Sequence, residues 1–205
     1  MTTQPVKNLD VIRDTIQGNL HRFERHVSPL AQTPAAVAIV IMVDRGVPML
    51  PIFQRPDTMS RHPGQMALPG GRLHEGEDAE ACSLRELAEE LGLGVGAEDV
   101  LGKLDDFDTR SGFTITPVVV WSGAGLAALR PSPAEVARLF MVRAPELRQA
   151  VAEAAQRPPE RFSLVLPEVE VFAPTAAMLY QFSEVALDGR STRVADFHQP
   201  SWTHR

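Results

Sequence analysis

Residues 71–93 read GRLHEGEDAEACSLRELAEELGL, and the second half of this stretch has the pattern of a helix that ends at Gly92. On a helical wheel with about 100° per residue, Glu86, Glu89 and Glu90 share an arc of about 100°. The apolar residues fall on the opposite side of the wheel: Ala81, Leu84, Leu87, Ala88 and Leu91. The spacing predicts a helix over residues 79–91 with one face toward the core and the other toward something cationic.

The three glutamates of this helix repel one another. Glu86 stands three and four residues before Glu89 and Glu90, and each like-charge pair of this kind destabilises a helix by roughly 0.2–0.5 kcal/mol. A solvated acidic face is the alternative interpretation, but selection for solubility alone would place Lys or Arg at one of these positions. Hard divalent cations prefer carboxylate oxygens, often together with substrate phosphate, so the pattern favours a metal-binding face.

The excess charge of the whole chain lies in the same segment. The net charge is −6, and residues 75–90 contain seven acidic residues and one arginine. The other 189 residues contain 19 acidic and 19 basic residues. No broad basic surface is expected, which argues against binding to a nucleic acid polymer or to an anionic membrane.

Two glycines and a further acid stand before the helix. Pro69, Gly70 and Gly71 predict a tight turn whose backbone approaches a ligand without a Cβ in the way. Glu77 lies near the start of the helix, where an acid interacts favourably with the helix dipole. Along the chain, five residues separate Gly71 from Glu77, and seven separate Glu77 from Arg85-Glu86-Leu87. One residue then separates this tripeptide from Glu89-Glu90, and one more separates that pair from Gly92-Leu93.

This spacing resembles the Nudix box at every defined position. The resemblance implies an α+β protein with the Nudix fold, an α/β/α sandwich around a mixed β-sheet. It also implies a hydrolase that uses Mg²⁺ or Mn²⁺ to split a nucleoside diphosphate linked to another moiety. Its substrate would be a small-molecule diphosphate.

The resemblance also assigns a role to each residue of the motif. Glu86, Glu89 and Glu90 would bind the metal ions, and the carbonyl of Gly70 would complete their coordination. Arg85 would orient the glutamates, and Glu77 would be a supporting acid. The proton of the attacking water would go to one of these glutamates or to a later carboxylate such as Glu135, and the residues leave that choice open.

The segment before the motif resembles the coenzyme A pyrophosphatase branch of the same family. Its signature matches at Arg55, Gly64, Pro69, Gly70 and Gly71. It departs at Pro51, Phe53, Pro56, Ser60 and Leu68, and Arg61 stands one position after the place of a usual arginine. The residues expected to bind substrate are Arg55, Arg61, Gly64, Gly71 and Arg72, because guanidinium groups suit phosphate oxygens.

This branch would split coenzyme A (CoA) or acyl-CoA into 3′,5′-ADP and 4′-phosphopantetheine. The first alternative is a Nudix hydrolase of another diphosphate, such as ADP-ribose, a nucleotide sugar or a damaged nucleotide. The second is a ligand-binding regulator with the same fold and no chemistry, whose mark would be the loss of one of the three glutamates.

Hydrophobic periodicity predicts further elements along the chain. Helices are expected over residues 8–26, 145–155 and 173–187, and strands over 35–43, 48–55, 100–107, 113–121 and 136–142, with two short strands within 162–172. Residues 56–77 are expected to be a long functional loop. We divide the chain into an N-terminal helical extension (1–30), a Nudix domain (31–188) and an irregular tail (189–205).

Three further expectations concern single residues and the surroundings of the protein. Cys82 is the one cysteine, which excludes an internal disulfide and, together with the absence of a signal-like segment, favours the cytoplasm. The longest apolar run has nine residues, too short to span a membrane. For Asp105, Asp106 and Asp108 we expect a solvated strand end rather than a second metal site. The sequence does not decide the oligomeric state, and a homodimer is one option.

Overall fold

The central strand of the protein, β1 (Thr33–Asp44), is apolar on both faces. The computed structural model describes residues 4–30, 32–59, 62–157 and 162–200. Val37, Ile39 and Ile41 point into one hydrophobic cluster, and the alternate residues Ala38, Val40 and Met42 point into a second. A strand covered on both faces has a continuous apolar run rather than an alternating one, which explains the composition of residues 35–43.

The sheet around β1 is mixed. Its other strands are β2 (Val47–Gln54), β3 (Met66–Ala67), β4 (Gly70–Arg72), β5 (Val100–Lys103), β6 (Phe107–Asp108), β7 (Phe113–Trp121) and β8 (Arg138–Arg143). The main order is β3-β2-β1-β7-β5, while β4 pairs with β1, β6 with β7 and β8 with β2. The β1–β7 pair is parallel and the other pairs are antiparallel. A separate hairpin consists of β9 (Ser163–Val165) and β10 (Glu170–Phe172).

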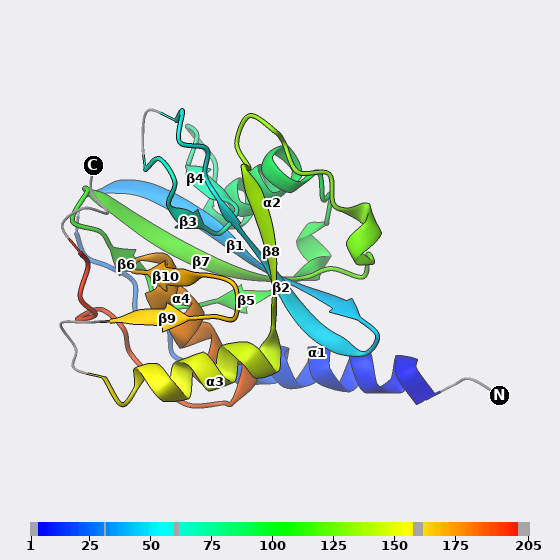
Figure 1. Ribbon diagram of the computed structural model, residues 1–205. Helices are drawn as coiled ribbons and strands as arrows, with labels where there is room; N and C mark the ends of the chain where they lie inside the picture. Colours follow the sequence, from blue (N-terminus) through cyan, green and yellow to red (C-terminus); the bar gives the residue numbers. More distant parts are fainter. Residues whose placement is uncertain (1–3, 31, 60–61, 158–161, 201–205) are drawn as a thin grey trace.

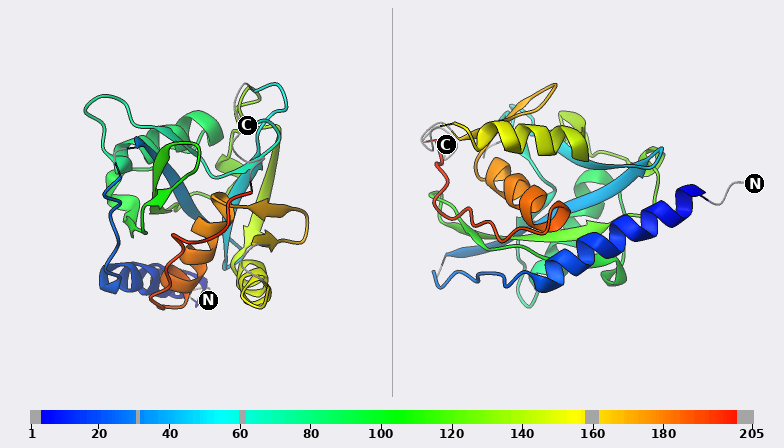
Figure 2. Two further views of the ribbon diagram at one scale, coloured as in Figure 1. Left: turned by 90° about the vertical axis from the view of Figure 1, so that its left-hand side faces the viewer. Right: turned by 90° about the horizontal axis from the view of Figure 1, so that it is seen from below.

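Helices cover both faces of this sheet. Helix α2 (Ala79–Leu91) lies on one face, above the sheet in Figure 1. The opposite face carries α1 (Gln4–Arg22), α3 (Ala144–Ala154) and α4 (Thr175–Gln181), which continues as the π-helical turn η4 (Phe182–Leu187) (Figure 2). Two short 3₁₀ turns are η1 (Ala97–Asp99) and η2 (Leu126–Ala128). The arrangement confirms the predicted α/β/α sandwich. No helix in the described ranges is long and apolar enough to cross a membrane.

Several predicted elements differ from the observed ones. The supposed loop 56–77 contains β3 and β4, because both pair with longer strands that supply their hydrogen-bond partners. The tight turn expected at Gly70 and Gly71 is likewise wrong, since both residues belong to β4. The expected strand 100–107 is two strands, since the amide of Asp106 binds the carbonyl of His26 instead of a neighbouring strand. The first helix spans 4–22 rather than 8–26, and the last begins at Thr175 and changes to π geometry at Phe182.

The residues after η4 have no regular secondary structure up to residue 200, but they pack against the domain. Val194 and Gln199 are buried. The Phe197 ring lies 4.3 Å from the Phe162 ring and 5.1 Å from the Tyr180 ring, measured between centroids, in edge-on geometry. The described part of the tail therefore lies against the domain and buries some of its side chains there.

Candidate functional site

The ends of α2 are set by its neighbouring residues. The Asp78 carboxylate accepts a hydrogen bond from the amide of Ala81 at 2.8 Å and caps the first turn. Gly92 ends the helix in the left-handed conformation, with φ of 65°. A side chain at Gly92 would also meet Arg130, because an added Cβ would lie 2.6 Å from the Cβ of that residue. The helix therefore spans the predicted residues 79–91, and its glutamates occupy fixed positions along it.

The buried face of α2 is not the predicted one. Its buried residues are Cys82, Ser83, Leu87, Glu90 and Leu91. Ala81 and Ala88, expected in the core, are exposed. The observed buried arc is turned by roughly 100° from the predicted one on the wheel. The side of the helix that faces β1 and β4 decides which residues are covered. As a result Glu90, expected on the polar face, is 3% exposed.

Arg85 is the centre of a cluster of carboxylates at the start of this helix. Its guanidinium donates to both oxygens of Glu77, at 2.9 Å and 3.0 Å. It also donates to Glu86 at 2.8 Å and to Glu89 at 3.1 Å. Further contacts are with the carbonyl of Arg72 at 3.2 Å and with the sulfur of Cys82 at 3.5 Å. One guanidinium thus orients three carboxylates, and its bidentate bond to Glu77 lowers the pKa of that residue to about 2.

Gly71 allows the Glu86 carboxylate to lie against the backbone of β4. A Cβ at this position would stand 2.0 Å from Oε1 of Glu86 and 2.5 Å from its Cδ. Any side chain at residue 71 would therefore displace the carboxylate. The second glycine of the motif is required by a close approach rather than by an unusual backbone angle, since its φ is not in the left-handed region.

Glu90 is the most buried carboxylate of the group. Its Oε2 accepts a hydrogen bond from the amide of Gly70 at 2.9 Å, and its Oε1 lies 3.9 Å from Nη1 of Arg55. Burial raises the pKa of Glu90 to about 8, and the neighbouring charges of Glu86 and Glu135 act in the same direction. The hydrogen bond from Gly70 and the charge of Arg55 oppose this rise.

Glu135, the other candidate for accepting a proton, belongs to a loop on the C-terminal end of α2. The amide of Ser132 binds the carbonyl of Glu90 at 2.8 Å, and the amide of Arg130 binds that of Leu91 at 2.7 Å. Glu135 is half-buried and close enough for its charge to raise the pKa of Glu90. Glu90 and Glu135 therefore lie near each other at the C-terminal end of α2.

The donor atoms around α2 are oxygens and suit a hard divalent cation. Glu86, Glu89 and Glu90 supply carboxylates beside the backbone of Gly70, and the space that a Cβ would fill at Gly71 is used by Glu86. In the described residues no three acids, histidines or cysteines converge closely enough to count as a ready-made metal site. Instead, Arg85 contacts Glu86 and Glu89, and Gly70 contacts Glu90. The chemistry of the donor set fits Mg²⁺ or Mn²⁺.

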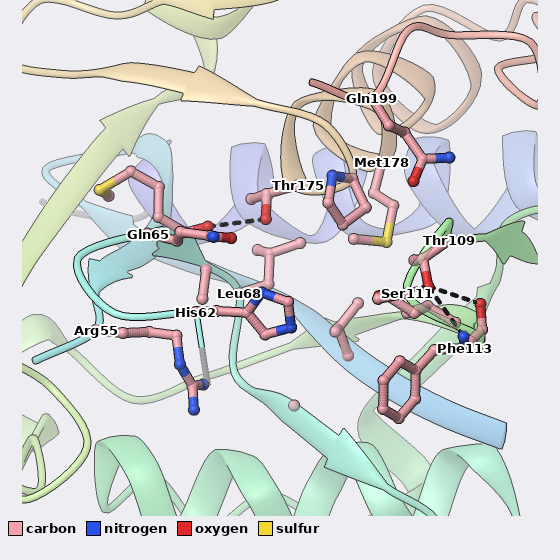
Figure 3. A pocket seen from close by; sticks show the side chains of 16 residues that line it. Arg55, His62, Gln65, Leu68, Thr109, Ser111, Phe113, Thr175, Met178 and Gln199 are labelled. Atoms are coloured by element: carbon pink, nitrogen blue, oxygen red, sulfur yellow. Dashed lines mark hydrogen bonds between the residues drawn. The ribbon is translucent and has the colours of Figure 1, made fainter. Parts of the chain in front are cut away.

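A cavity of about 140 Å³, whose lining residues Figure 3 shows, reaches the surroundings of Glu90 through Arg55 and Gly70. Its apolar lining consists of Val37, Met66, Ala67, Leu68, Phe113, Ile115, Pro174 and Met178, and its polar lining of Arg55, His62, Gln65, Gly70, Thr109, Ser111, Thr175 and Gln199. An engineered apolar cavity of about 150 Å³ holds a benzene molecule, so this one admits a ring or a short chain rather than a whole nucleotide. Arg55 and Gly70 belong both to this cavity and to the surroundings of Glu90.

The other residues expected to bind substrate are dispersed. Gly64, in the left-handed region with φ of 67°, lies beside Gln54, whose side chain donates to its carbonyl. Arg72 is exposed and its guanidinium carbon lies 4.9 Å from the centre of the Phe113 ring. Arg61 lies outside the described residues. Of these residues, the structure places only Arg55 and Gly71 directly against the glutamates of α2.

Asp105 and Asp106 are buried, with 6% and 9% of their surfaces exposed, so the expected solvated strand end is wrong. Asp105 accepts hydrogen bonds from Arg193 and Gln181, both at 2.6 Å, and Asp106 accepts one from Arg25 at 2.5 Å. The segments that carry Arg25 and Arg193 pack over this turn. A local pattern of three acids does not reveal partners so distant in sequence. Cys82 is buried and its pKa is raised to about 11, mainly by burial, as is typical of a packed thiol rather than a nucleophile.

Sequence reasoning missed one wall of the cavity. Thr175, Met178 and Gln199 reach it from α4 and the tail, more than 80 residues after the motif. No motif or periodicity singles out these residues. A periodic apolar face predicts that α4 is buried, but not that its first turn faces a cavity beside the glutamates.

Comparison with known proteins agrees with this geometry. A model of the NUDIX domain matches residues 32–166. The uncharacterized Nudix hydrolase NudL of Klebsiella aerogenes is 41% identical over 102 residues, 49% of this chain and 83% of that protein. The mitochondrial coenzyme A diphosphatase NUDT8 of Mus musculus is 36% identical over 130 residues, 61% of this chain and 62% of that enzyme. A NUDIX hydrolase from Alicyclobacillus acidocaldarius shares the fold, with a TM-score of 0.50 at 17% identity over 80% of this chain and 95% of that one.

The matched NUDIX domain covers the central strand β1, the cluster around Arg85 and strand β4 with its two glycines. The chain therefore belongs to the Nudix family, whose members hydrolyse diphosphate bonds and generally use divalent metal ions.

Proposed function

We propose that this chain is a metal-dependent diphosphatase that hydrolyses CoA or acyl-CoA to 3′,5′-ADP and 4′-phosphopantetheine. The observation that carries the proposal is the position of Arg55, which lies 3.9 Å from Glu90 and also lines the apolar cavity. A diphosphate bound at Arg55 would face the glutamates on one side, while an uncharged arm of the same substrate entered the cavity. The relationship to a mouse CoA diphosphatase supports the same substrate.

Glu86, Glu89 and Glu90 are the proposed metal ligands, with the backbone of Gly70 beside them. Bound Mg²⁺ or Mn²⁺ supplies charge that offsets the phosphates and lowers the pKa of a coordinated water. Arg85 positions Glu86 and Glu89 through its two hydrogen bonds, and Glu77 holds the guanidinium of Arg85 in place. Arg55 is the proposed partner for a phosphate oxygen, and Arg72 a second, outer one.

The reaction adds one water across the phosphoanhydride. A bond forms between the water oxygen and one phosphorus, and the bond from that phosphorus to the bridging oxygen breaks. The bridging oxygen leaves as part of the second phosphate, and the proton of the water goes to Glu90 or Glu135. The nearness of Glu90 and Glu135, which lie on adjacent segments at the same end of α2, supports this proposal.

A product assay tests the substrate. The purified protein would be incubated with CoA, ADP-ribose, NADH and 8-oxo-dGTP, with Mg²⁺ and with Mn²⁺ in turn, and the products separated by chromatography. We expect 3′,5′-ADP and 4′-phosphopantetheine from CoA, and kcat/KM for CoA at least about tenfold above that for the other compounds. Preferential cleavage of another diphosphate would overturn the CoA assignment and leave the metal-dependent chemistry standing.

Metal dependence is tested in the same assay after treatment with a chelator. Activity should disappear and return on addition of Mg²⁺ or Mn²⁺, since the glutamates cannot bind phosphate by themselves. Full activity without any divalent cation would contradict the proposed ligands.

A further inference from the structure

One wall of the cavity comes from outside the part of the chain that matches the NUDIX domain. The match ends at residue 166, whereas Pro174, Thr175, Met178 and Gln199 line the cavity from α4 and the tail. Figure 3 shows Thr175, Met178 and Gln199 opposite Arg55 and His62, with Thr109, Ser111 and Phe113 along the side. Residues specific to this C-terminal segment thus face whatever part of the substrate extends beyond Arg55.

This wall is held in position by hydrogen bonds to the domain. The Thr175 hydroxyl donates to the carbonyl of Met66 at 3.0 Å, joining α4 to β3. The Gln199 side chain accepts from the amide of Arg110 at 3.0 Å and donates to the carbonyl of Asp108 at 2.9 Å. Both residues are buried, and Met178 between them is 2% exposed. The cavity is therefore a formed site whose shape depends on the tail.

The lining suits an uncharged chain better than a nucleotide. Among the described lining residues the cationic or ionisable ones are Arg55, which is 3.9 Å from Glu90, and His62. The rest of the lining combines methyl and thioether groups with the hydroxyls of Thr109 and Ser111, which lie 3.0 Å apart. The Thr109 hydroxyl is already bonded to the backbone of Phe113, so the Ser111 hydroxyl is the one that can bond an amide or hydroxyl of a ligand. A bisphosphorylated nucleoside would place charged groups where these residues offer no cation.

The phenyl ring of the cavity is covered on one face, because the guanidinium of Arg72 lies 4.9 Å from the centre of the Phe113 ring. The feature that separates the two halves of the substrate is therefore charge, since most of the lining is uncharged.

We infer that the cavity binds the uncharged, non-nucleotide arm of the substrate, which in CoA is the pantetheine chain, and that Met178 and Gln199 determine specificity for it. The inference rests on the proposed function and deepens it. The nucleotide half then lies outside the cavity, on the other side of Arg55. Substrates with a charged second arm are disfavoured by the apolar part of this lining.

Binding of the two halves of CoA to the metal-free protein tests this assignment without catalysis. Calorimetric titrations would use pantetheine and 3′,5′-ADP separately, with wild type, Met178→Trp and Ser111→Phe. Met178→Trp fills the cavity from α4, and Ser111→Phe fills it from a half-buried loop position that is less important for folding. Val165→Trp adds the same indole at an exposed position on β9 and serves as the control.

We expect pantetheine to bind wild type and the control, with an affinity at least about tenfold lower in both cavity variants, while affinity for 3′,5′-ADP stays unchanged. KM for CoA should rise in the variants with little change in kcat. The assignment is overturned if pantetheine shows no binding at 10 mM, if both variants bind it as wild type does, or if they weaken 3′,5′-ADP instead.

The same data separate this inference from the proposed function. If wild type binds pantetheine in a manner that depends on the cavity but does not cleave CoA, the proposed function fails and the cavity assignment stands. If wild type cleaves CoA and both variants keep its KM, the proposed function stands and the cavity assignment fails. Circular dichroism of each variant shows whether it is folded. If Met178→Trp does not fold, the binding data for Ser111→Phe decide the test.

Discussion

Two acidic clusters of this protein have similar composition and opposite environments. Asp105, Asp106 and Asp108 have nearly one basic or hydroxyl partner for each oxygen, including the guanidinium groups of Arg193 and Arg25. The second cluster has one guanidinium, that of Arg85, for the carboxylates of Glu77, Glu86 and Glu89. The aspartate cluster has two guanidinium groups for three carboxylates, while the cluster on α2 has one for three and keeps more negative charge.

The difference indicates which cluster serves the fold and which serves a ligand. Buried charges that have enough partners stabilise one arrangement of the chain, and removing one partner is costly. Carboxylates that lack partners cost stability unless a cation joins them, and perturbed carboxylates of this kind gather at functional sites. Glu90 has the clearest imbalance, because it is 3% exposed and its nearest cation, Arg55, is 3.9 Å away.

The largest expected effect comes from Glu90→Gln. The amide can still accept the hydrogen bond from Gly70, but it cannot serve as an anionic metal ligand or take a proton. Hydrolysis should fall by about 100-fold or more, with a melting temperature no lower than that of wild type. Enzyme kinetics and thermal unfolding measure the two quantities.

Glu80→Gln is the matched control for this variant. Glu80 is on the same helix but pairs with Lys103 at 2.7 Å, away from the other glutamates. Its substitution should leave kcat within about twofold, since exposed ion pairs contribute little. Full activity of Glu90→Gln would mean that the acidic cluster on α2 is structural like the aspartate cluster.

Asp105→Asn should have the opposite signature. The Asp105 carboxylate accepts from the backbone amide of His26, from Arg193 and from Gln181, whereas asparagine offers one acceptor oxygen, so a buried donor loses its acceptor. We expect a loss of about 1–3 kcal/mol in the free energy of unfolding and unchanged kcat per folded molecule. Chemical denaturation and an activity assay at low temperature check both. A loss of activity without a loss of stability would contradict the structural role.

Gly71→Ala tests how closely the α2 cluster is fitted. The added methyl would lie 2.0 Å from the Glu86 carboxylate, so that side chain must move. Mn²⁺ affinity, measured by calorimetry, should fall about tenfold. Gly94→Ala is the control, because a Cβ there meets nothing within 4 Å. Equal Mn²⁺ affinities for the two variants would show that the position of Glu86 does not matter for the metal.

The smallest effect concerns the pH dependence contributed by Glu77. Its pKa is lowered to about 2 in the folded protein, so the pair with Arg85 stabilises the fold above the unfolded pKa near 4.5. That contribution is lost as pH falls from 4.5 through 2. Wild type should therefore lose stability more steeply than Glu77→Gln in acid, and the two should converge near pH 2. Parallel acid-unfolding curves would contradict the pairing.

The parts of the site that are local in sequence were predictable. Helix α2 has the predicted bounds, because its N-cap Asp78 and its C-terminal glycine act within one turn of the helix. The spacing of Glu77, Arg85 and Glu86 likewise places them within reach of one another along one helix and the turn before it. The family resemblance rested on these positions, and it led to the correct sandwich fold.

The parts that depend on distant segments were not predictable. The buried face of α2 was placed wrongly because hydrophobicity alone ranks Ala88 above Glu90, whereas contact with β1 and β4 decides which side is covered. The aspartate cluster was taken for a solvated strand end because its partners Arg25 and Arg193 lie about 80 and 88 residues away. Periodicity reports on a helix or a strand, not on what packs against it.

The amino-acid sequence alone specified the helix with its glutamates, because this follows from spacing within 23 residues, and the resemblance of that spacing to a known family implied the type of reaction. Tertiary packing decided that Glu90 is buried, that Arg55 joins it to a cavity, and that Met178 and Gln199 close that cavity from the C-terminal segment. Burial and pKa depend on every segment that excludes water from a group, and those segments meet only in the folded chain.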